Sequence, residues 1–119
     1  MFSRGKNNYD IFFGRGTLMK IFDITDDTYT NEIENYEGTV LIDFFADWCT
    51  PCKMLSPMIE DVADETDVKI CKVNVESEKM LAQRFGIMSI PTLIVMKNGT
   101  VINRSIGITG KKAILDMIK

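Results

Sequence analysis

Two cysteines and the residues beside them are the part of this chain best suited to chemistry. The segment Trp48-Cys49-Thr50-Pro51-Cys52 places two thiols three positions apart. On a helix, side chains at this spacing share one face and lie within reach of a disulfide bond. The segment therefore predicts thiol–disulfide exchange. The alternatives are a structural disulfide, or two buried cysteines without a redox role.

The position of the pair in the sequence separates the roles of the two thiols. An apolar, strand-like run ends just before Cys49, helical spacing follows, and Pro51 suits the first turn of a helix. The free amide groups and the positive end of the helix dipole stabilise a thiolate there, which lowers the pKa of the first cysteine. Cys49 is therefore predicted to be the solvent-facing nucleophile, and Cys52, one turn further along, the shielded resolving thiol.

One charged residue, Asp43, lies inside the apolar run before the cysteines. On a strand, Leu41, Asp43 and Phe45 share one face, and Ile42 and Phe44 share the other. Both faces are otherwise apolar, so we expect Asp43 to be buried, which raises the pKa of its carboxyl. A half-exposed strand that leaves Asp43 in water is the alternative.

The composition limits what else the chain could do. Its 119 residues are a length typical of one domain, and they carry 14 basic and 17 acidic side chains without a clustered basic face. Nucleic-acid binding is therefore not expected. No apolar run approaches the roughly 18 residues of a membrane span. Three cysteines and no histidine cannot form a four-cysteine zinc site or a Cys–His catalytic pair, so no metal is expected.

The elements that must position the thiols follow from periodicity and turn residues. Strands and helices are predicted to alternate, and Asn98-Gly99 is a strong hairpin signal near the end. The predicted strands cover 19–24, 39–46, 68–75 and the two runs of 92–107, and the predicted helices cover 25–38, a segment from 49, 77–86 and 109–119. Ser77 and Thr109 are the expected caps of the last two helices. This order predicts an α/β fold with a mixed sheet, parallel at first and antiparallel in the hairpin, and helices on both faces.

The amino-terminal residues do not fit this pattern. Residues 1–17 are polar and contain glycine, and the short apolar run within them lacks the features of a signal peptide. We expect 1–17 to be a poorly ordered extension and 18–119 to be the folded domain. An ordered extra strand in the extension is the alternative.

Three segments together resemble the thioredoxin family. They are FFADWCTPCKMLSP (44–57), IPTLIVMKNG (90–99) and IGITGKKAI (106–114), and the resemblance runs from about Met19 to Lys119. It implies a thioredoxin fold and reduction of protein disulfides by dithiol–disulfide exchange, with no bound cofactor.

The resemblance also assigns roles to residues outside the cysteine pair. It implies that Asp43 accepts the proton of Cys52 and that Lys72 tunes Asp43. From the sequence alone, a Lys72 side chain that extends from a strand end into solvent is equally reasonable. A trans bond before Pro91 is also what the sequence alone favours, whereas the resemblance implies a cis bond between Ile90 and Pro91.

A docking surface and partners follow from the same resemblance. The residues expected to contact substrate are Trp48, Thr50, Pro51, Ile90, Pro91, Gly107 and Ile108. The implied partners are disulfide-containing proteins and a thioredoxin reductase, a flavoprotein that uses NADPH. A cytoplasmic monomer is expected.

The sequence departs from the family pattern at two positions. Thr50 stands where the family usually has glycine, which puts the redox potential in question, and Phe45 stands where many members have tryptophan. Thr50-Pro51 also disfavours a glutathione-linked or oxidising relative. A thioredoxin-fold binding module with incidental redox activity is the remaining alternative. Cys71, inside an apolar strand, is expected to be a buried thiol without a role.

Overall fold

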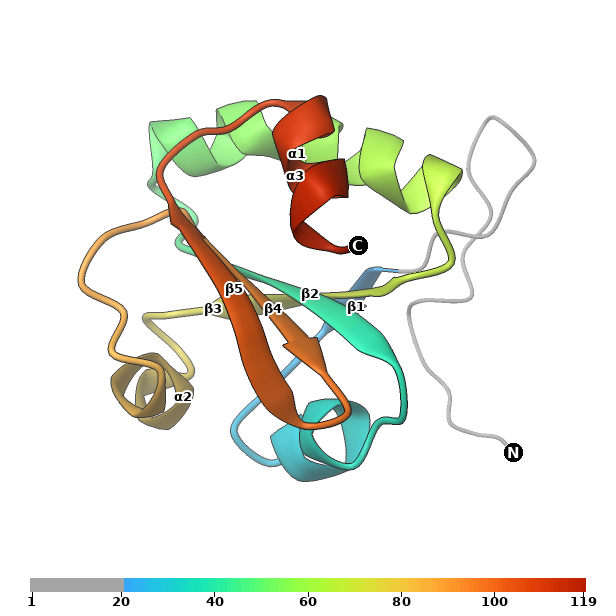
Figure 1. Cartoon of the computed structure of the whole chain (residues 1–119). Coiled ribbons are helices and arrows are strands. Elements are labelled where there is room, and N and C mark those ends of the chain that lie inside the picture. Colours follow the sequence, from blue (N-terminus) through green and yellow to red (C-terminus); the bar gives the residue numbers. More distant parts are fainter. Residues whose placement is uncertain (1–20) are drawn as a thin grey trace.

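The computed structural model describes residues 21–119, and its centre is a five-stranded mixed sheet in the order β1-β3-β2-β4-β5 (Figure 1). Strands β1 and β2 are parallel to β3, β4 is antiparallel to β2, and β5 is antiparallel to β4. The strands are β1 (Ile21–Asp23), β2 (Thr39–Phe45), β3 (Lys69–Asn74), β4 (Thr92–Lys97) and β5 (Thr100–Ile106). The predicted α/β fold with a mixed sheet is confirmed. The predicted extension at 1–17 and the start of the domain at 18 lie outside the described residues.

Helices cover both faces of this sheet, and each face has its own hydrophobic core. Helices α1 (Thr50–Glu65) and α3 (Lys111–Met117) lie on one face, and α2 (Lys79–Arg84) and the π-helical turn η2 (Thr30–Glu34) lie on the other (Figure 1). Alternate residues of β2 divide between the two cores. Val40, Ile42 and Phe44 face η2 and α2, and Leu41 faces α1 and α3. The strand is thus buried on both sides, as its apolar sequence indicates.

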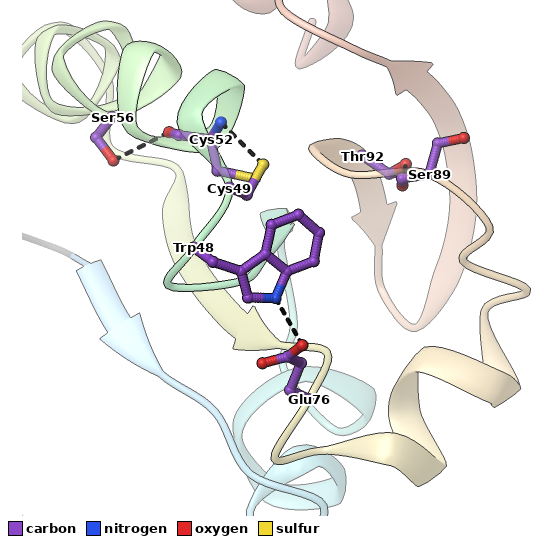
Figure 2. Close-up of a disulfide and its surroundings, with 7 residues drawn as sticks. All are labelled: Trp48, Cys49, Cys52, Ser56, Glu76, Ser89 and Thr92. Atoms are coloured by element: carbon purple, nitrogen blue, oxygen red, sulfur yellow. Dashed lines mark hydrogen bonds between the residues drawn. A yellow bond between two sulfur atoms is a disulfide. The ribbon is translucent and has the colours of Figure 1, made fainter.

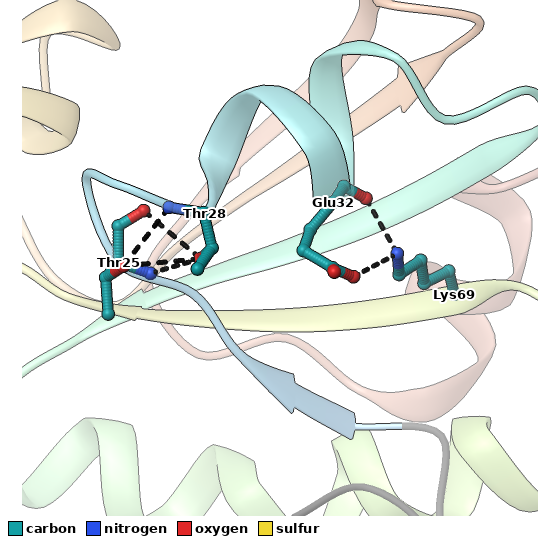
Figure 3. Close-up of polar contacts among 4 residues, drawn as sticks. All are labelled: Thr25, Thr28, Glu32 and Lys69. Carbon is teal, nitrogen blue, oxygen red and sulfur yellow. Dashed lines mark hydrogen bonds and ion pairs between the residues drawn. The ribbon is translucent and has the colours of Figure 1, made fainter. Parts of the chain in front are cut away.

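The predicted helix over 25–38 is wrong in extent, since only η2 is helical. The first residues of this range form a turn instead: the backbone N–H of Thr25 donates to Thr28 Oγ1, and the backbone N–H of Thr28 donates to the Thr25 carbonyl (Figure 3). The helical turn that follows is wide, because the Asn35 N–H bonds the Thr30 carbonyl five residues back. Hydrogen bonds between threonine side chains and the backbone therefore replace the first turns of the predicted helix.

A buried lysine from β3 fastens this turn to the sheet. Lys69 Nζ donates to the backbone carbonyl and to the carboxylate of Glu32, at 2.8 Å each (Figure 3). The ammonium also lies 4.7 Å from the ring centre of Phe22 and 4.6 Å from that of Tyr36. These contacts compensate the charge for its loss of water.

Helix α2 begins with a cap from a distant part of the chain, not from the predicted Ser77. Asp26, in the loop after β1, accepts a hydrogen bond from the Leu81 N–H at 3.0 Å. In return, the Asp26 N–H donates to the carboxylate of Glu78 at 2.9 Å. This reciprocal pair fixes α2 against the β1 loop, and the end of α2 leads directly into the segment that precedes β4.

Helix α3 also lacks its predicted cap, Thr109. Gly110 is the N-cap residue, and it has no side chain to bond the first amides. The helix is held by tertiary contacts instead, because Lys111 pairs with Glu65 of α1 and Ile114 is fully buried in the core beneath. Packing thus replaces capping at this end of the chain.

The hairpin that joins β4 to β5 is confirmed. Asn98 and Gly99 have φ values of 50° and 82°, the left-handed conformations that a tight hairpin turn of this kind requires. A register shift between Val95 and Met96 interrupts the pairing with β5. The hairpin places β5 at the edge of the sheet.

Candidate active site

The two cysteines lie where β2 ends and α1 begins. Cys49 is the N-cap residue of α1, with an extended backbone, and Cys52 is in the first turn (Figure 2). The two residues form a disulfide, with their Cα atoms 5.2 Å apart. The backbone N–H of Cys52 donates to Cys49 Sγ, with 3.2 Å between nitrogen and sulfur. The prediction of a bonding pair at the start of a helix is confirmed.

The expected difference in exposure between the two thiols is wrong for this disulfide form. Cys49 is 2% exposed and Cys52 is 4% exposed. In the disulfide the two sulfurs point at each other, and both cysteines pack with Ala46, Val75 and Ile90 in a small apolar cluster. What distinguishes the thiols is the backbone, since the Cys49 sulfur accepts the amide hydrogen bond of the first turn.

Asp43 is buried in the sheet, as predicted. The residue is 1% exposed, and neither carboxylate oxygen has a hydrogen-bond partner among the described residues. Burial raises the pKa of this carboxyl to about 6, and the charge of Lys72 acts in the opposite direction. A buried carboxyl without a hydrogen-bond partner is unfavourable for the stability of a fold.

Lys72 lies beside Asp43 on the neighbouring strand. The two residues are register partners in the parallel pairing of β2 with β3. The ammonium of Lys72 lies 4.6 Å from the centre of the Phe45 ring. Of the two sequence interpretations, the position next to Asp43 is the one observed, and it keeps a positive charge close to the buried acid.

A hollow of about 190 Å³ lies against both Lys72 and Cys52. It is lined by Phe45, Ala46, Asp47, Cys52, Lys53, Ser56 and Lys72. The volume is enough for several water molecules. Cys52 therefore has a polar hollow on one side and its disulfide partner on the other.

The loop before β4 faces the disulfide and contains a cis peptide bond between Ile90 and Pro91 (Figure 2). The expectation from the family resemblance is confirmed, and the trans bond favoured by the sequence alone is wrong. Thr92 Oγ1 donates to the Ser89 carbonyl at 2.7 Å, and the Gly107 N–H donates to the Pro91 carbonyl at 2.8 Å. The loop is therefore tied to β4 and to the end of β5.

Trp48 forms an exposed wall next to the disulfide. Its side chain is 65% exposed, and its indole N–H donates to the Glu76 carboxylate at 2.6 Å (Figure 2). Ile108, another predicted docking residue, is also exposed. Of the other predicted docking residues, Thr50 and Pro51 are exposed, Ile90 and Gly107 are half-buried, and Pro91 is buried.

A second hollow, of about 220 Å³, opens between Trp48 and the cis-proline loop. It is lined by Trp48, Val75, Ile87, Met88, Ser89 and Ile90. Sequence reasoning did not single out Val75, Ile87, Met88 or Ser89 of this lining, nor Glu76, the hydrogen-bond partner of Trp48. The position of Met88, two residues before the Ile-Pro-Thr segment, was a signal that could have identified it. Nothing local to Glu76 indicated that it would meet Trp48.

The residues between the cysteines are accessible. Thr50 and Pro51 are both exposed at the first turn of α1. Both side chains therefore lie at the surface next to the buried Cys49.

Cys71 is fully buried on β3, as predicted. Burial raises the pKa of its thiol to about 12, so the thiol stays protonated at neutral pH. Cys71 therefore contributes packing to the core beside η2 and α2.

Neither a metal site nor a membrane-spanning helix is found in the described part of the chain. Residues 21–119 contain no cluster of three or more histidine, cysteine, aspartate or glutamate side chains arranged to hold a metal ion. No helix within the same residues is long and apolar enough to cross a bilayer.

Comparison with known proteins relates this site to one family. The family model named Thioredoxin matches residues 20–119. Thioredoxin from Bacillus subtilis (strain 168) is 40% identical over 102 residues, which cover 84% of this chain and 96% of that protein. Thioredoxin from Chlorobaculum thiosulfatiphilum is 41% identical over 101 residues, which cover 83% and 94%.

A solved structure shows the same fold. A mutant thioredoxin from Halobacterium salinarum NRC-1, with one asparagine replaced by glutamine, superposes with a TM-score of 0.78 at 31% sequence identity. The match covers 87% of this chain and 93% of that one. The described sheet and its helices therefore have the thioredoxin fold, and the cysteine pair lies at the start of α1 within it.

Proposed function

The chain belongs to the thioredoxin family and is a protein-disulfide reductase, and we propose that Cys49 attacks the substrate while Cys52 resolves the mixed disulfide. The observation that carries this assignment is the hydrogen bond from the Cys52 N–H to Cys49 Sγ at the start of α1. An amide donor and the helix N-terminus both favour negative charge on that sulfur.

The exchange proceeds in two displacements. In the dithiol form, the Cys49 thiolate attacks one sulfur of the substrate disulfide, a Cys49–substrate bond forms, and the other substrate sulfur leaves as a thiolate. Cys52 then loses its proton and attacks Cys49 Sγ. This step forms the Cys49–Cys52 bond, for which the 5.2 Å Cα separation is suitable, and releases the second substrate thiolate.

Asp43 is the proposed proton acceptor for Cys52. With a pKa raised to about 6, its carboxyl is mostly ionised at neutral pH and still basic enough to take a proton. Lys72 tunes this carboxyl through its charge. The hollow that Cys52 and Lys72 line offers the proton a route to solvent.

Substrates are proposed to dock on the surface around the disulfide. The residues proposed to contact the substrate are Trp48, Thr50, Pro51, Ile90, Gly107 and Ile108, and the buried Pro91 belongs to the loop that presents Ile90. An extended substrate segment would pair with the Ile90 backbone in the manner of an added strand.

The proposed electron donor is a thioredoxin reductase, a flavoprotein that uses NADPH, and the protein acts as a monomer without a cofactor of its own. The proposed compartment is the cytoplasm. Reducing conditions there keep a free thiol such as Cys71 unpaired.

The test is reduction of insulin by dithiothreitol in the presence of the protein. The Cys49→Ser variant should lose the catalysed rate, because the first bond cannot form. Cys52→Ser should form the mixed disulfide and stall, so it should trap substrates covalently. Cys71→Ala is the matched control and should retain the rate. If Cys49→Ser is as active as the unmodified chain, the assignment of the nucleophile is wrong. A binding module becomes the better description if the unmodified protein does not reduce insulin and the double Cys→Ser variant still binds its partner.

A further inference from the structure

Met88 is an apolar side chain at the docking surface that is left almost entirely in solvent. It is 96% exposed, the highest value among the large exposed hydrophobic residues of the described chain. It also lines the 220 Å³ hollow together with Trp48 and Ile90. Ile90 packs against the cluster that contains the disulfide. A thioether is therefore exposed next to the redox centre.

The disulfide form leaves few other sites for a peroxide to attack in the described residues. Cys49 and Cys52 are joined, and Cys71 is buried with a pKa raised to about 12. Neither a disulfide nor a protonated thiol reacts readily with a peroxide, because the thiolate is the reactive species. Met96 is 3% exposed and is protected by the core. Exposed thioethers remain accessible.

We propose that Met88 is an oxidation site at which a peroxide converts the thioether to a sulfoxide and thereby weakens the docking of protein substrates. The inference rests on the proposed function, since it concerns the surface where substrates bind. In the reaction, the sulfur gives two electrons to the peroxide and an S=O bond forms as the O–O bond breaks. With hydrogen peroxide the second oxygen leaves as water.

The location of Met88 explains why this change would matter. A sulfoxide is polar and accepts hydrogen bonds, whereas the hollow is walled by Trp48, Val75, Ile87 and Ile90. A docked substrate that covered the sulfoxide would remove it from water without an assured donor, which opposes binding. The Trp48 indole donates a hydrogen bond to Glu76, so the ring cannot turn away from the sulfoxide without losing that bond.

Two other exposed methionines provide matched controls. Met54 on α1 is 58% exposed and Met80 on α2 is 71% exposed. Neither lines the hollow beside Trp48. They should also oxidise, but more slowly than Met88, and their sulfoxides should leave docking unaffected.

The experiment treats the full chain in its disulfide form with hydrogen peroxide, removes the peroxide with catalase, and measures the sulfoxide at each methionine by peptide mass spectrometry. Dithiothreitol-driven reduction of insulin is then compared with reduction of bis(2-hydroxyethyl) disulfide, a substrate too small to cover Met88. Each variant is compared with its own untreated sample. We expect Met88 to oxidise first and kcat/KM for insulin to fall about tenfold, which corresponds to about 1.4 kcal/mol. The rate with the small disulfide should not change.

Substitutions separate Met88 from the other methionines. Treated Met88→Leu should keep its untreated insulin rate, while treated Met54→Leu and Met80→Leu should lose about as much as the unmodified chain. The proposal is overturned if Met88 is not the fastest site among the three, if protein oxidised at Met88 keeps its insulin rate, or if Met88→Leu is equally sensitive. A failure of the proposed function would appear separately, as an untreated protein that does not reduce insulin.

Discussion

At the scale of single residues, the proposed mechanism depends on a carboxyl placed where it is unfavourable for stability. Asp43 is buried without a hydrogen-bond partner among the described residues, and burial raises its pKa to about 6. A carboxyl of ordinary pKa would be a weaker base toward a thiol at neutral pH. The raised basicity of the Asp43 carboxyl therefore depends on its burial in the sheet without a hydrogen-bond donor.

This arrangement predicts a specific pH dependence. Because Asp43 accepts protons only when ionised, the rate of the resolving step should rise with pH through a limb near pH 6. Asp43→Asn should lower the rate at pH 7 by about tenfold or more and should remove that limb. Rapid-mixing measurements of mixed-disulfide resolution between pH 5 and 8 test this. If the rate of Asp43→Asn still rises with pH near pH 6, this pH dependence belongs to another group.

Glu76 is expected to support substrate docking through Trp48. Their 2.6 Å hydrogen bond fixes an indole that is otherwise largely exposed. Glu76→Ala should lower kcat/KM for insulin about threefold, and Glu76→Gln, which keeps an acceptor oxygen, should lower it less. Glu60→Ala, at an exposed position on α1, is the control. Equal effects of the alanine and glutamine variants would contradict a role for the bond.

At the scale of elements, the active site depends on how short helices are attached. Helix α2 is six residues long, too short to be stable alone. It is held by the reciprocal bonds between Asp26 and the residues at its start. Since α2 leads into the cis-proline loop, this attachment indirectly positions the docking surface.

Removal of this attachment should be measurable as a loss of stability. Asp26→Ala deletes the acceptor for the Leu81 N–H, and the free energy of unfolding should fall by about 1 kcal/mol, the usual effect of losing a helix cap. Urea denaturation provides the measurement. Asp27→Ala, one residue along and exposed, should change stability much less. If the two variants are equally stable, the distant cap contributes nothing.

At the scale of the whole molecule, two hydrophobic cores enclose a sheet that contains one unpartnered acid. The rise of the Asp43 pKa from 3.8 to about 6 means that the unfolded chain releases this proton at lower pH than the folded chain does. The contribution of Asp43 to stability therefore becomes less favourable as pH increases from about 4 to about 6, and the full penalty remains above that range.

Comparison of Asp43→Asn with the unmodified chain isolates this effect. The substitution should be more stabilising at pH 7 than at pH 4, by about 2 kcal/mol, because only the unmodified chain carries the buried charge at the higher pH. Guanidinium denaturation of the disulfide forms at both pH values tests it. If the difference in unfolding free energy between the two proteins is the same at both pH values, Asp43 has the same pKa in the folded and the unfolded chain.

The sequence by itself determined the features that local interactions encode. The order of strands and helices, the tight turn at Asn98-Gly99, the cysteine pair at a helix start and the burial of Asp43 all follow from periodicity and turn chemistry over a few residues. The cis bond before Pro91 needed the family resemblance, because local energetics favour trans.

Only the tertiary structure decided which distant side chains meet. Asp26 caps a helix 55 residues further along the chain, and Glu76 bonds an indole 28 residues earlier. The nearly equal burial of the two thiols likewise depends on Val75 and Ile90, which packing brings from other elements. Such partners are fixed by the way helices and strands pack together, so no short stretch of sequence contains the information that selects them.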